Sequence, residues 1–176
     1  MHLVGAPICF SLGALEVEVH DGQPQGVEAL IVEEDTFLVL SAPPEIREVR
    51  EHPMRVLTGV LEAKPHPLGS IQLREGAPLV LRAVVDALEE DPPGSLPAVE
   101  RALEAAFAEI LRRRMRWVGL ELLGAIHGGL DPSAISDLLA ARLQTLPPGS
   151  LARLSIVTRS RDREGVAERL RSSYQR

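Results

Sequence analysis

A glycine-rich segment, Gly124-Ala125-Ile126-His127-Gly128-Gly129, carries the clearest potential for chemistry in this chain of 176 residues. Glycines let backbone N–H groups approach an anion closely, and the dipole of a following helix favours negative charge. A helix is expected to follow here, capped by Asp131 with Pro132 at its first position. The segment therefore predicts a turn that holds a phosphate. Two alternatives stay open: a tight strand-to-helix turn needs glycine without any ligand, and Asp131 would compete for the same amides.

Titratable side chains offer weaker candidates. His127 is a candidate catalytic group, because an imidazole in this turn could polarise a carbonyl or a phosphate. A plain loop histidine is the preferred interpretation. The run Glu33-Glu34-Asp35 could serve a metal or acid/base chemistry, but neighbours in an extended chain point in opposite directions, so at most Glu33 and Asp35 converge. A solvated loop is the preferred interpretation of this run. Cys9, the only cysteine, lies in an apolar stretch and is expected to pack.

Alternating strands and helices must position these residues. Strands or short apolar runs are expected at residues 15–19, 29–32, 37–40, 71–73, 78–85, 117–123 and 151–157, and helices at 44–51, after Ser95, after Asp131 and at 161–174. The alternation of apolar and acidic residues at 15–19 is typical of an edge or half-buried strand. Residues 1–15 contain no Lys or Arg, so they indicate a buried strand and its turn more than an export signal.

Strands that alternate with helices predict crossover connections and a parallel sheet. The expected fold is a three-layer α/β/α sandwich with a mixed, mostly parallel sheet. It forms one domain over residues 1–176, in which residues 1–14 add an N-terminal strand and turn. In such sheets ligands bind beyond the carboxyl ends of the strands, where the glycine-rich segment is placed.

Composition excludes several classes of function. The net charge of −6 argues against nucleic-acid binding. The longest apolar run after residue 15, residues 117–126, contains Glu121 and is far shorter than the ~20 residues of a membrane span. One cysteine and scattered histidines predict neither a metal nor another cofactor. A reducing cytoplasm is expected. The absence of asparagine and the dominance of arginine, with Lys64 the only lysine, fit a thermophilic bacterium.

Five segments in order resemble the macro domain family, which holds ADP-ribose and related nucleotides. They are Val17-Glu18-Val19-His20-Asp21-Gly22-Gln23, Val27-Glu28-Ala29-Leu30-Ile31-Val32, Pro67-Leu68-Gly69-Ser70-Ile71, Leu79-Val80-Leu81-Arg82-Ala83-Val84 and residues 123–130. The resemblance implies the macro-type sandwich over the chain from about residue 15. It also implies ligand contacts at Gly22, Gln23, Glu33, Gly124, Ala125, Ile126, His127, Gly128 and Gly129.

The departures from the family pattern fall on the ligand contacts. Gln23 replaces the acid that reads adenine, Glu33-Glu34-Asp35-Thr36 replaces an Asn-Ala-Ala-Asn stretch, and Ile126 replaces a glycine of the phosphate loop. We therefore expect a divergent, non-enzymatic module that binds a nucleotide-like or ADP-ribose-related ligand weakly, or that serves as an interaction domain. One alternative is a hydrolase of ADP-ribosyl groups or phosphoesters that uses His127 and a nearby carboxylate. Another is a structural homo-oligomer with a vestigial pocket.

Overall fold

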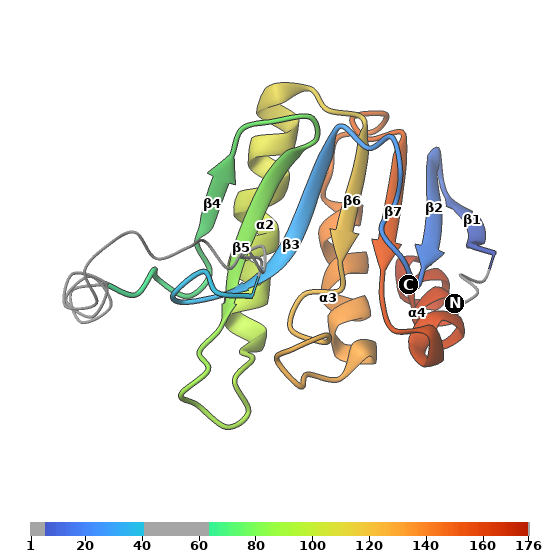
Figure 1. Ribbon diagram of the computed structural model, residues 1–176. Helices are drawn as coiled ribbons and strands as arrows, with labels where there is room; N and C mark the ends of the chain where they lie inside the picture. The colour runs from blue at the N-terminus through green and yellow to red at the C-terminus, as the bar shows by residue number, and fades with distance from the viewer. Residues whose placement is uncertain (1–5, 41–63, 176) are drawn as a thin grey trace.

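The computed structural model describes residues 6–40 and 64–175. From residue 79 to residue 174, strands and helices alternate as the sequence predicts (Figure 1). In chain order the elements are β1 (Ile8–Leu12), β2 (Leu15–His20), β3 (Ala29–Asp35), β4 (Ile71–Arg74), β5 (Leu79–Asp86), α2 (Leu96–Arg113), β6 (Trp117–Glu121), α3 (Pro132–Gln144), β7 (Arg153–Val157), the 3-10 turn η1 (Ser160–Asp162) and α4 (Arg163–Tyr174). The helix predicted at residues 44–51 lies outside the described residues.

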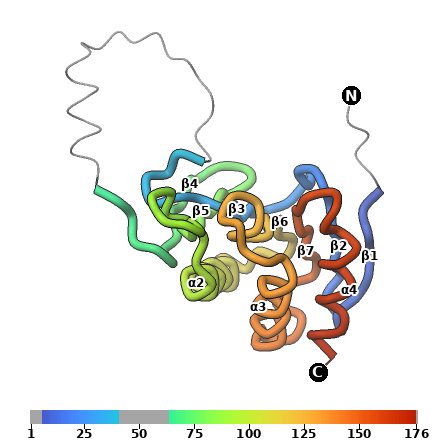
Figure 2. The backbone as a smooth tube through the Cα atoms, turned by 90° about the horizontal axis from the view of Figure 1, so that it is seen from below, coloured from blue at the N-terminus to red at the C-terminus, as the bar shows by residue number. Residues whose placement is uncertain are grey.

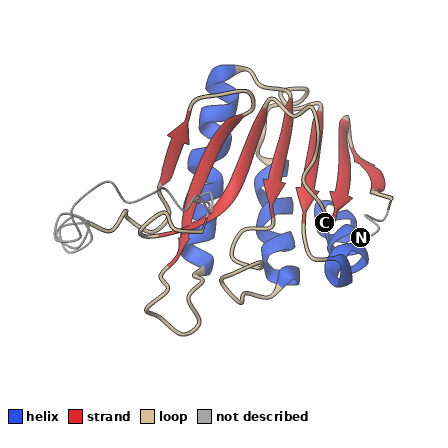
Figure 3. Ribbon diagram, viewed as in Figure 1, coloured by secondary structure: helices blue, strands red, loops and turns tan. Residues whose placement is uncertain are grey.

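The strands form one seven-stranded sheet in the order β1-β2-β7-β6-β3-β5-β4 (Figure 3). Strands β2, β7, β6, β3 and β5 run parallel, and β1 and β4 pair antiparallel at the two edges. After β3 the chain builds β4 and β5 on one side of that strand, and it then crosses through α2 to β6 on the other side. The strand order therefore reverses around β3, which is the kind of position where open α/β sheets bind ligands.

One apolar core lies between the sheet and helices α2, α3 and α4, which share one side of the sheet (Figure 2). The stripe predicted for α2 is confirmed, since Val99, Leu103, Ala106, Phe107 and Ile110 are all buried. Each large apolar side chain buried in this way stabilises the fold by roughly 1.5–3 kcal/mol. This burial fixes α2 against β5 and β4, at one side of the sheet.

The predicted α/β sandwich with a mixed, mostly parallel sheet is confirmed. Within residues 6–40 and 64–175, the helices form a layer on one face only (Figure 2). Asp131 caps α3 as predicted, because its Oδ1 accepts a hydrogen bond of 3.0 Å from the Ser133 N–H, and Pro132 is the first helical residue. Among the described helices, none combines the length and the apolar composition that a membrane span requires.

The half-buried strand predicted at residues 15–19 is confirmed. These residues belong to β2, which is an internal strand between β1 and β7. Its alternating pattern arises because Val17 and Val19 face the helices while Glu16 and Glu18 face away from them. Strand β1, expected to be buried, forms the edge of the sheet, and Cys9 on it is exposed. Residues 37–40 form a turn and no strand.

We predict that Phe107→Ala lowers the free energy of unfolding by about 3–5 kcal/mol, because it empties a site in the centre of the core. Chemical denaturation followed by circular dichroism measures the change. Phe37→Ala is the matched control, since the Phe37 side chain is 46% exposed and its loss should cost less than about 1 kcal/mol. Equal losses for the two variants would contradict the burial described above.

Candidate functional site

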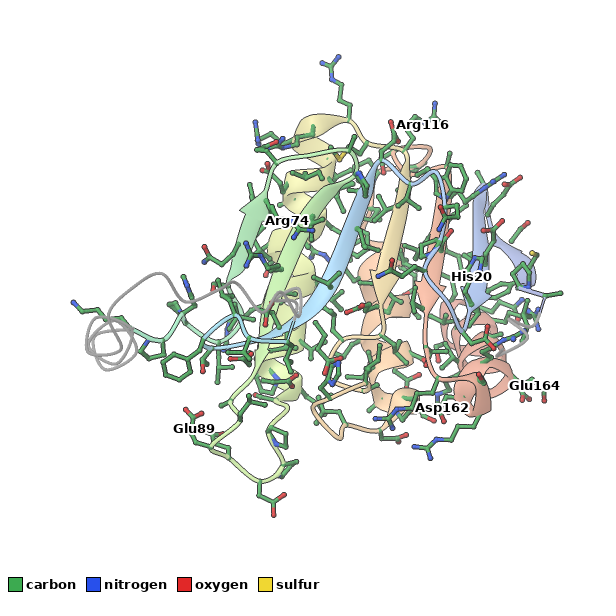
Figure 4. All side chains as sticks on the ribbon, in the orientation of Figure 1. His20, Arg74, Glu89, Arg116, Asp162 and Glu164 are labelled. Atoms are coloured by element: carbon green, nitrogen blue, oxygen red, sulfur yellow. The ribbon has the colours of Figure 1, made fainter. Side chains whose placement is uncertain are left out.

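The candidate site lies at the carboxyl ends of β3, β5 and β6, beside the reversal of strand order. Figure 4 shows Glu89, on the loop after β5, and Asp162, at the end of η1 after β7, at this end of the strands. Arg116 lies at the opposite end. The predicted glycine-rich segment connects β6 to α3 at this edge, and the Leu130 N–H closes it by donating to the Gly124 carbonyl at 2.9 Å. Its placement next to a helix N-terminus is as the sequence predicts.

The backbone amides of this turn are already occupied. The Glu33 Oε1 accepts hydrogen bonds from the N–H groups of His127 at 2.8 Å and Gly128 at 2.9 Å, and its Oε2 accepts one from Ile126 at 3.2 Å. The predicted competitor for these amides, Asp131, bonds to its own helix instead. A side-chain carboxylate from β3 therefore sits where the sequence predicts a phosphate.

The preferred interpretation of Glu33-Glu34-Asp35 as a solvated loop is wrong. These residues are the last three of β3, and their exposed fractions are 2%, 0% and 0%. Burial is tolerated because backbone N–H groups solvate the carboxylates, and hydrogen bonds to a charged group are the strong ones. The Asp35 Oδ1 accepts from the Phe37 N–H at 2.7 Å. Its Oδ2 accepts from Val39 at 2.8 Å and from Leu40 at 3.1 Å.

The turn after β3 is thus filled in the same way as the turn after β6. The Leu40 N–H also donates to Glu34 Oε1 at 2.8 Å, so two acids share this turn. Leu38 takes a left-handed backbone conformation, with φ of 59°, to keep its neighbours directed at Asp35. The sequence allows Glu33 and Asp35 to converge on one ligand, but in the structure they do not. Glu33 accepts N–H groups of the turn after β6, whereas Asp35 accepts those of the turn after β3.

Two further acids complete the site, and neither is predicted as a site residue from the sequence. Glu121, the last residue of β6, accepts the Glu33 N–H through Oε2 at 2.7 Å. Burial raises the pKa of Glu121 to about 7; its hydrogen bond from Glu33 N–H opposes the rise, and the charges of Glu33 and Glu34 add to it. At neutral pH a substantial part of the protein therefore carries a neutral Glu121.

Asp86, the last residue of β5, is fully buried and lies within hydrogen-bonding reach of the Glu33 carboxyl group. No donor among the described residues serves either of its carboxyl oxygens. Burial, followed by the hydrogen-bonding contact with Glu33 and the charges of Glu33, Asp35 and Glu34, raises the pKa of Asp86 to about 8. Like charges at such distances cannot both stay ionised cheaply, so one carboxyl of the pair keeps a proton.

The structure brings three predicted residues, Gln23, Glu33 and His127, to the wall of one cleft of about 220 Å³. Glu121 and Arg74 share this wall, and the apolar part of the lining is formed by Leu30, Val32, Leu40 and Val80. The side chains of Gln23 and His127 are on the exposed rim. The other six predicted residues do not line the cleft, although they lie in the turns that follow β2 and β6: Gly22, Gly124, Ala125, Ile126, Gly128 and Gly129.

Gly128 is the glycine whose small size matters most. A Cβ at this position would lie 2.3 Å from the Asp86 Oδ1 and 2.7 Å from the Gly124 carbonyl oxygen. Any side chain would therefore push the turn away from Glu33 and Asp86. Ile126, which replaces a family glycine, donates its N–H to Glu33 without a left-handed backbone.

No pattern in the sequence marks Asp86 as a site residue. The apolar run at residues 78–85 ends one residue before it, and only the pairing of β5 with β3 shows that Asp86 faces Asp35. A bulge in this pairing, between Glu34 and Asp35, sets that partnership. In the sequence, Glu121 stands out only as a charged residue inside an apolar run.

The fold and this turn define an α/β sandwich of the macrodomain type. No family model matches the sequence, and no curated protein does. Solved structures do match. An Oceanobacillus iheyensis macrodomain, in the form of a mutant with ADPR, is 11% identical with a TM-score of 0.70 over 97% of this chain and 100% of that one.

Two other structures give the same result. The macro domain of ganglioside induced differentiation associated protein 2 is 11% identical, with a TM-score of 0.65 over 96% of this chain and 89% of that one. A Trypanosoma brucei macrodomain in complex with ADP is 15% identical, with a TM-score of 0.62 over 88% and 68%. The chain therefore has the macrodomain fold, which confirms the fold that the sequence resemblance implies.

We predict that Asp86→Asn makes the protein increasingly more stable than the wild type as the pH rises from 5 to 9. The pKa of Asp86 is raised from 3.8 to about 8, so between these values the folded state holds a proton that the unfolded chain has lost, and stability falls with rising pH. Asparagine is neutral throughout. The difference in Tm should grow by several degrees, since ~1 kcal/mol corresponds to roughly 2–4 °C at this size.

Differential scanning calorimetry at pH 5, 7 and 9 measures this effect. Glu89→Gln, which neutralises an exposed acid on the loop after β5, is the control and should shift Tm equally at all three values. A constant difference between Asp86→Asn and the wild type would show that Asp86 holds no proton in the folded protein.

Proposed function

We propose that the chain is a non-catalytic module that binds a nucleotide-like ligand, related to ADP-ribose, weakly and in competition with its own Glu33. The observation that carries this proposal is the Glu33 carboxylate, which accepts the N–H groups of Ile126, His127 and Gly128. Those three amides are the natural donors for a phosphate at this turn. A ligand phosphate must displace the carboxylate before it can use them.

The choice of ligand class is supported by the fold and by the position of the cleft. Proteins of the same fold have been solved with ADPR and with ADP bound. In this chain the cleft lies at the reversal of strand order and combines an apolar lining with the polar side chains of Gln23, Arg74 and His127 on its wall. Its volume of about 220 Å³ is below the ~300–1,000 Å³ of typical ligand pockets, in keeping with weak binding.

Electrostatics also limit the affinity for a diphosphate. Glu33, Glu34 and Asp35 are buried at this edge of the sheet. At ~4 Å and an effective dielectric constant of ~20, two like charges repel by about 4 kcal/mol. A ligand that displaced Glu33 would therefore lose much of the free energy that it gains from the amides.

The hydrolase alternative gains no support from the described contacts. A general base must be free to reach the proton that it removes. The carboxylate nearest to the turn, Glu33, instead holds three amides. His127 is exposed on the rim of the cleft, and among the described contacts only its backbone N–H reaches a carboxylate. We therefore infer that the module binds its ligand without converting it. The roles as an interaction domain or a homo-oligomer stay predictions.

Isothermal titration calorimetry with ADP-ribose tests the proposal. Glu33→Ala vacates the three amides and removes a charge, so its affinity for ADP-ribose should exceed that of the wild type by at least about tenfold, or 1.4 kcal/mol. Glu89→Ala, at an exposed acid, should leave the affinity unchanged. Thermal unfolding of each variant checks that it is folded.

A second substitution ties the gain to the turn. In the Glu33→Ala background, Gly128→Val should abolish the gained binding, because a side chain there collides with Asp86 and with the Gly124 carbonyl. The proposal is wrong if folded Glu33→Ala binds ADP-ribose no better than the wild type. Release of ADP-ribose from a modified peptide by the wild type, lost in His127→Ala, would favour the hydrolase instead.

A further inference from the structure

Asp86 is the one acid of the site that no backbone amide solvates. Its side chain is 0% exposed, and neither Oδ1 nor Oδ2 has a hydrogen-bond donor among the described residues. Glu33 and Asp35 each receive three N–H groups, and Glu34 and Glu121 each receive at least one. A buried ionised carboxylate without any donor is very costly, so Asp86 needs another way to be satisfied.

Within residues 6–40 and 64–175, the surroundings of the Asp86 carboxyl group offer it one polar partner. Its Oδ1 lies beside the Cα of Gly128, since a Cβ there would come within 2.3 Å of that oxygen, and its backbone forms a bridge to Gly94. The β3 acids Glu33, Glu34 and Asp35 are close enough for their charges to act on it, and of these Glu33 is within hydrogen-bonding reach. The Glu33 Oε1 accepts the N–H of the same Gly128 at 2.9 Å, so both carboxyl groups adjoin this glycine. Two ionised carboxylates have only acceptor atoms, so a hydrogen bond between Asp86 and Glu33 requires a proton on one of them.

The proton belongs on Asp86. Glu33 accepts three backbone N–H groups, which favour its ionised form, whereas Asp86 receives none. We propose that Asp86 is a positioning residue: its carboxyl group stays protonated and donates to Glu33, which keeps the Glu33 carboxylate in the turn after β6. This inference deepens the proposed function, because it names the residue that keeps the turn closed to an external phosphate.

The arrangement gives the turn a dependence on pH. With the proton in place, the pair carries one negative charge and a strong acid-to-carboxylate hydrogen bond. When Asp86 loses its proton, the pair carries two charges and the hydrogen bond is gone, so the Glu33 carboxylate is repelled from the turn. Glu121 from β6 and Glu34 and Asp35 from β3 add to that repulsion.

Carbon-detected NMR of protein labelled at its carboxyl carbons tests the proposal directly. The double variant Glu121→Gln with His127→Gln serves as the reference, because it removes the second carboxyl group and the imidazole from the wall of the cleft. In this reference at pH 6, the Asp86 carboxyl carbon should resonate as a protonated acid and that of Glu33 as a carboxylate. Both signals, and the backbone nitrogen of Gly128, should move together between pH 7 and 9.

Two substitutions at Asp86 separate positioning from packing. Asp86→Asn keeps a neutral donor for Glu33, so the Gly128 nitrogen should hold its pH 6 position up to pH 9. Asp86→Leu removes the donor, so the Gly128 nitrogen should resemble that of Glu33→Ala already at pH 6. An Asp86 carbon that titrates near pH 4, or an Asp86→Asn variant whose Gly128 nitrogen moves as in the reference, would overturn the proposal.

The NMR measurement contains no ligand, so its outcome is independent of ADP-ribose binding. If Glu33→Ala gains no affinity for ADP-ribose while the carboxyl carbons titrate together, the proposed function fails and the positioning role stands. If Glu33→Ala gains affinity while Asp86 titrates as an ordinary acid, the proposed function stands and the positioning role fails.

Discussion

The hydrogen bonds between the Glu33 carboxylate and the amides of residues 126–128 are the interaction on which the site depends. They join the end of β3 to the turn between β6 and α3, at the point where the strand order reverses. A helix N-terminus and a glycine-rich turn make a position that favours an anion. In this protein the chain supplies the anion itself, so the turn is ordered without a ligand.

Burying the Glu33 carboxylate beside other acids costs electrostatic free energy, and the neighbouring residues reduce this cost. Five acids meet at one edge of the sheet, and backbone amides stabilise four of them as acceptors. Burial raises the pKa of Asp86 to about 8 and that of Glu121 to about 7, so the site lowers its charge by holding protons. Satisfied amides and retained protons together explain how this macrodomain fold tolerates a cluster of buried acids at the edge where a ligand would bind.

The sequence predicted the fold better than the site, for a physical reason. Periodicity reports burial, so the α2 stripe and the cap of α3 at Asp131 were readable from residues near one another in the chain. Glu33 was recognised as a site residue through resemblance, yet its partners lie more than ninety residues away. Asp86 was not foreseen at all, because its role follows from the pairing of β5 with β3. The charges of Glu33, Glu34 and Asp35 also favoured a solvated loop. Their burial becomes possible because backbone N–H groups of the folded turns donate to them.

The irregular pairing at the end of β3 shows how consecutive acids come to serve separate turns. Glu34 is paired with Val84, but Asp35 is paired with Asp86, so β5 contributes one extra residue at this step. Strands with an extra residue twist and re-aim their side chains. In an evenly spaced pairing Val85 would lie opposite Asp35 and Asp86 would lie one residue further along, so this single extra residue is what places Asp86 opposite Asp35.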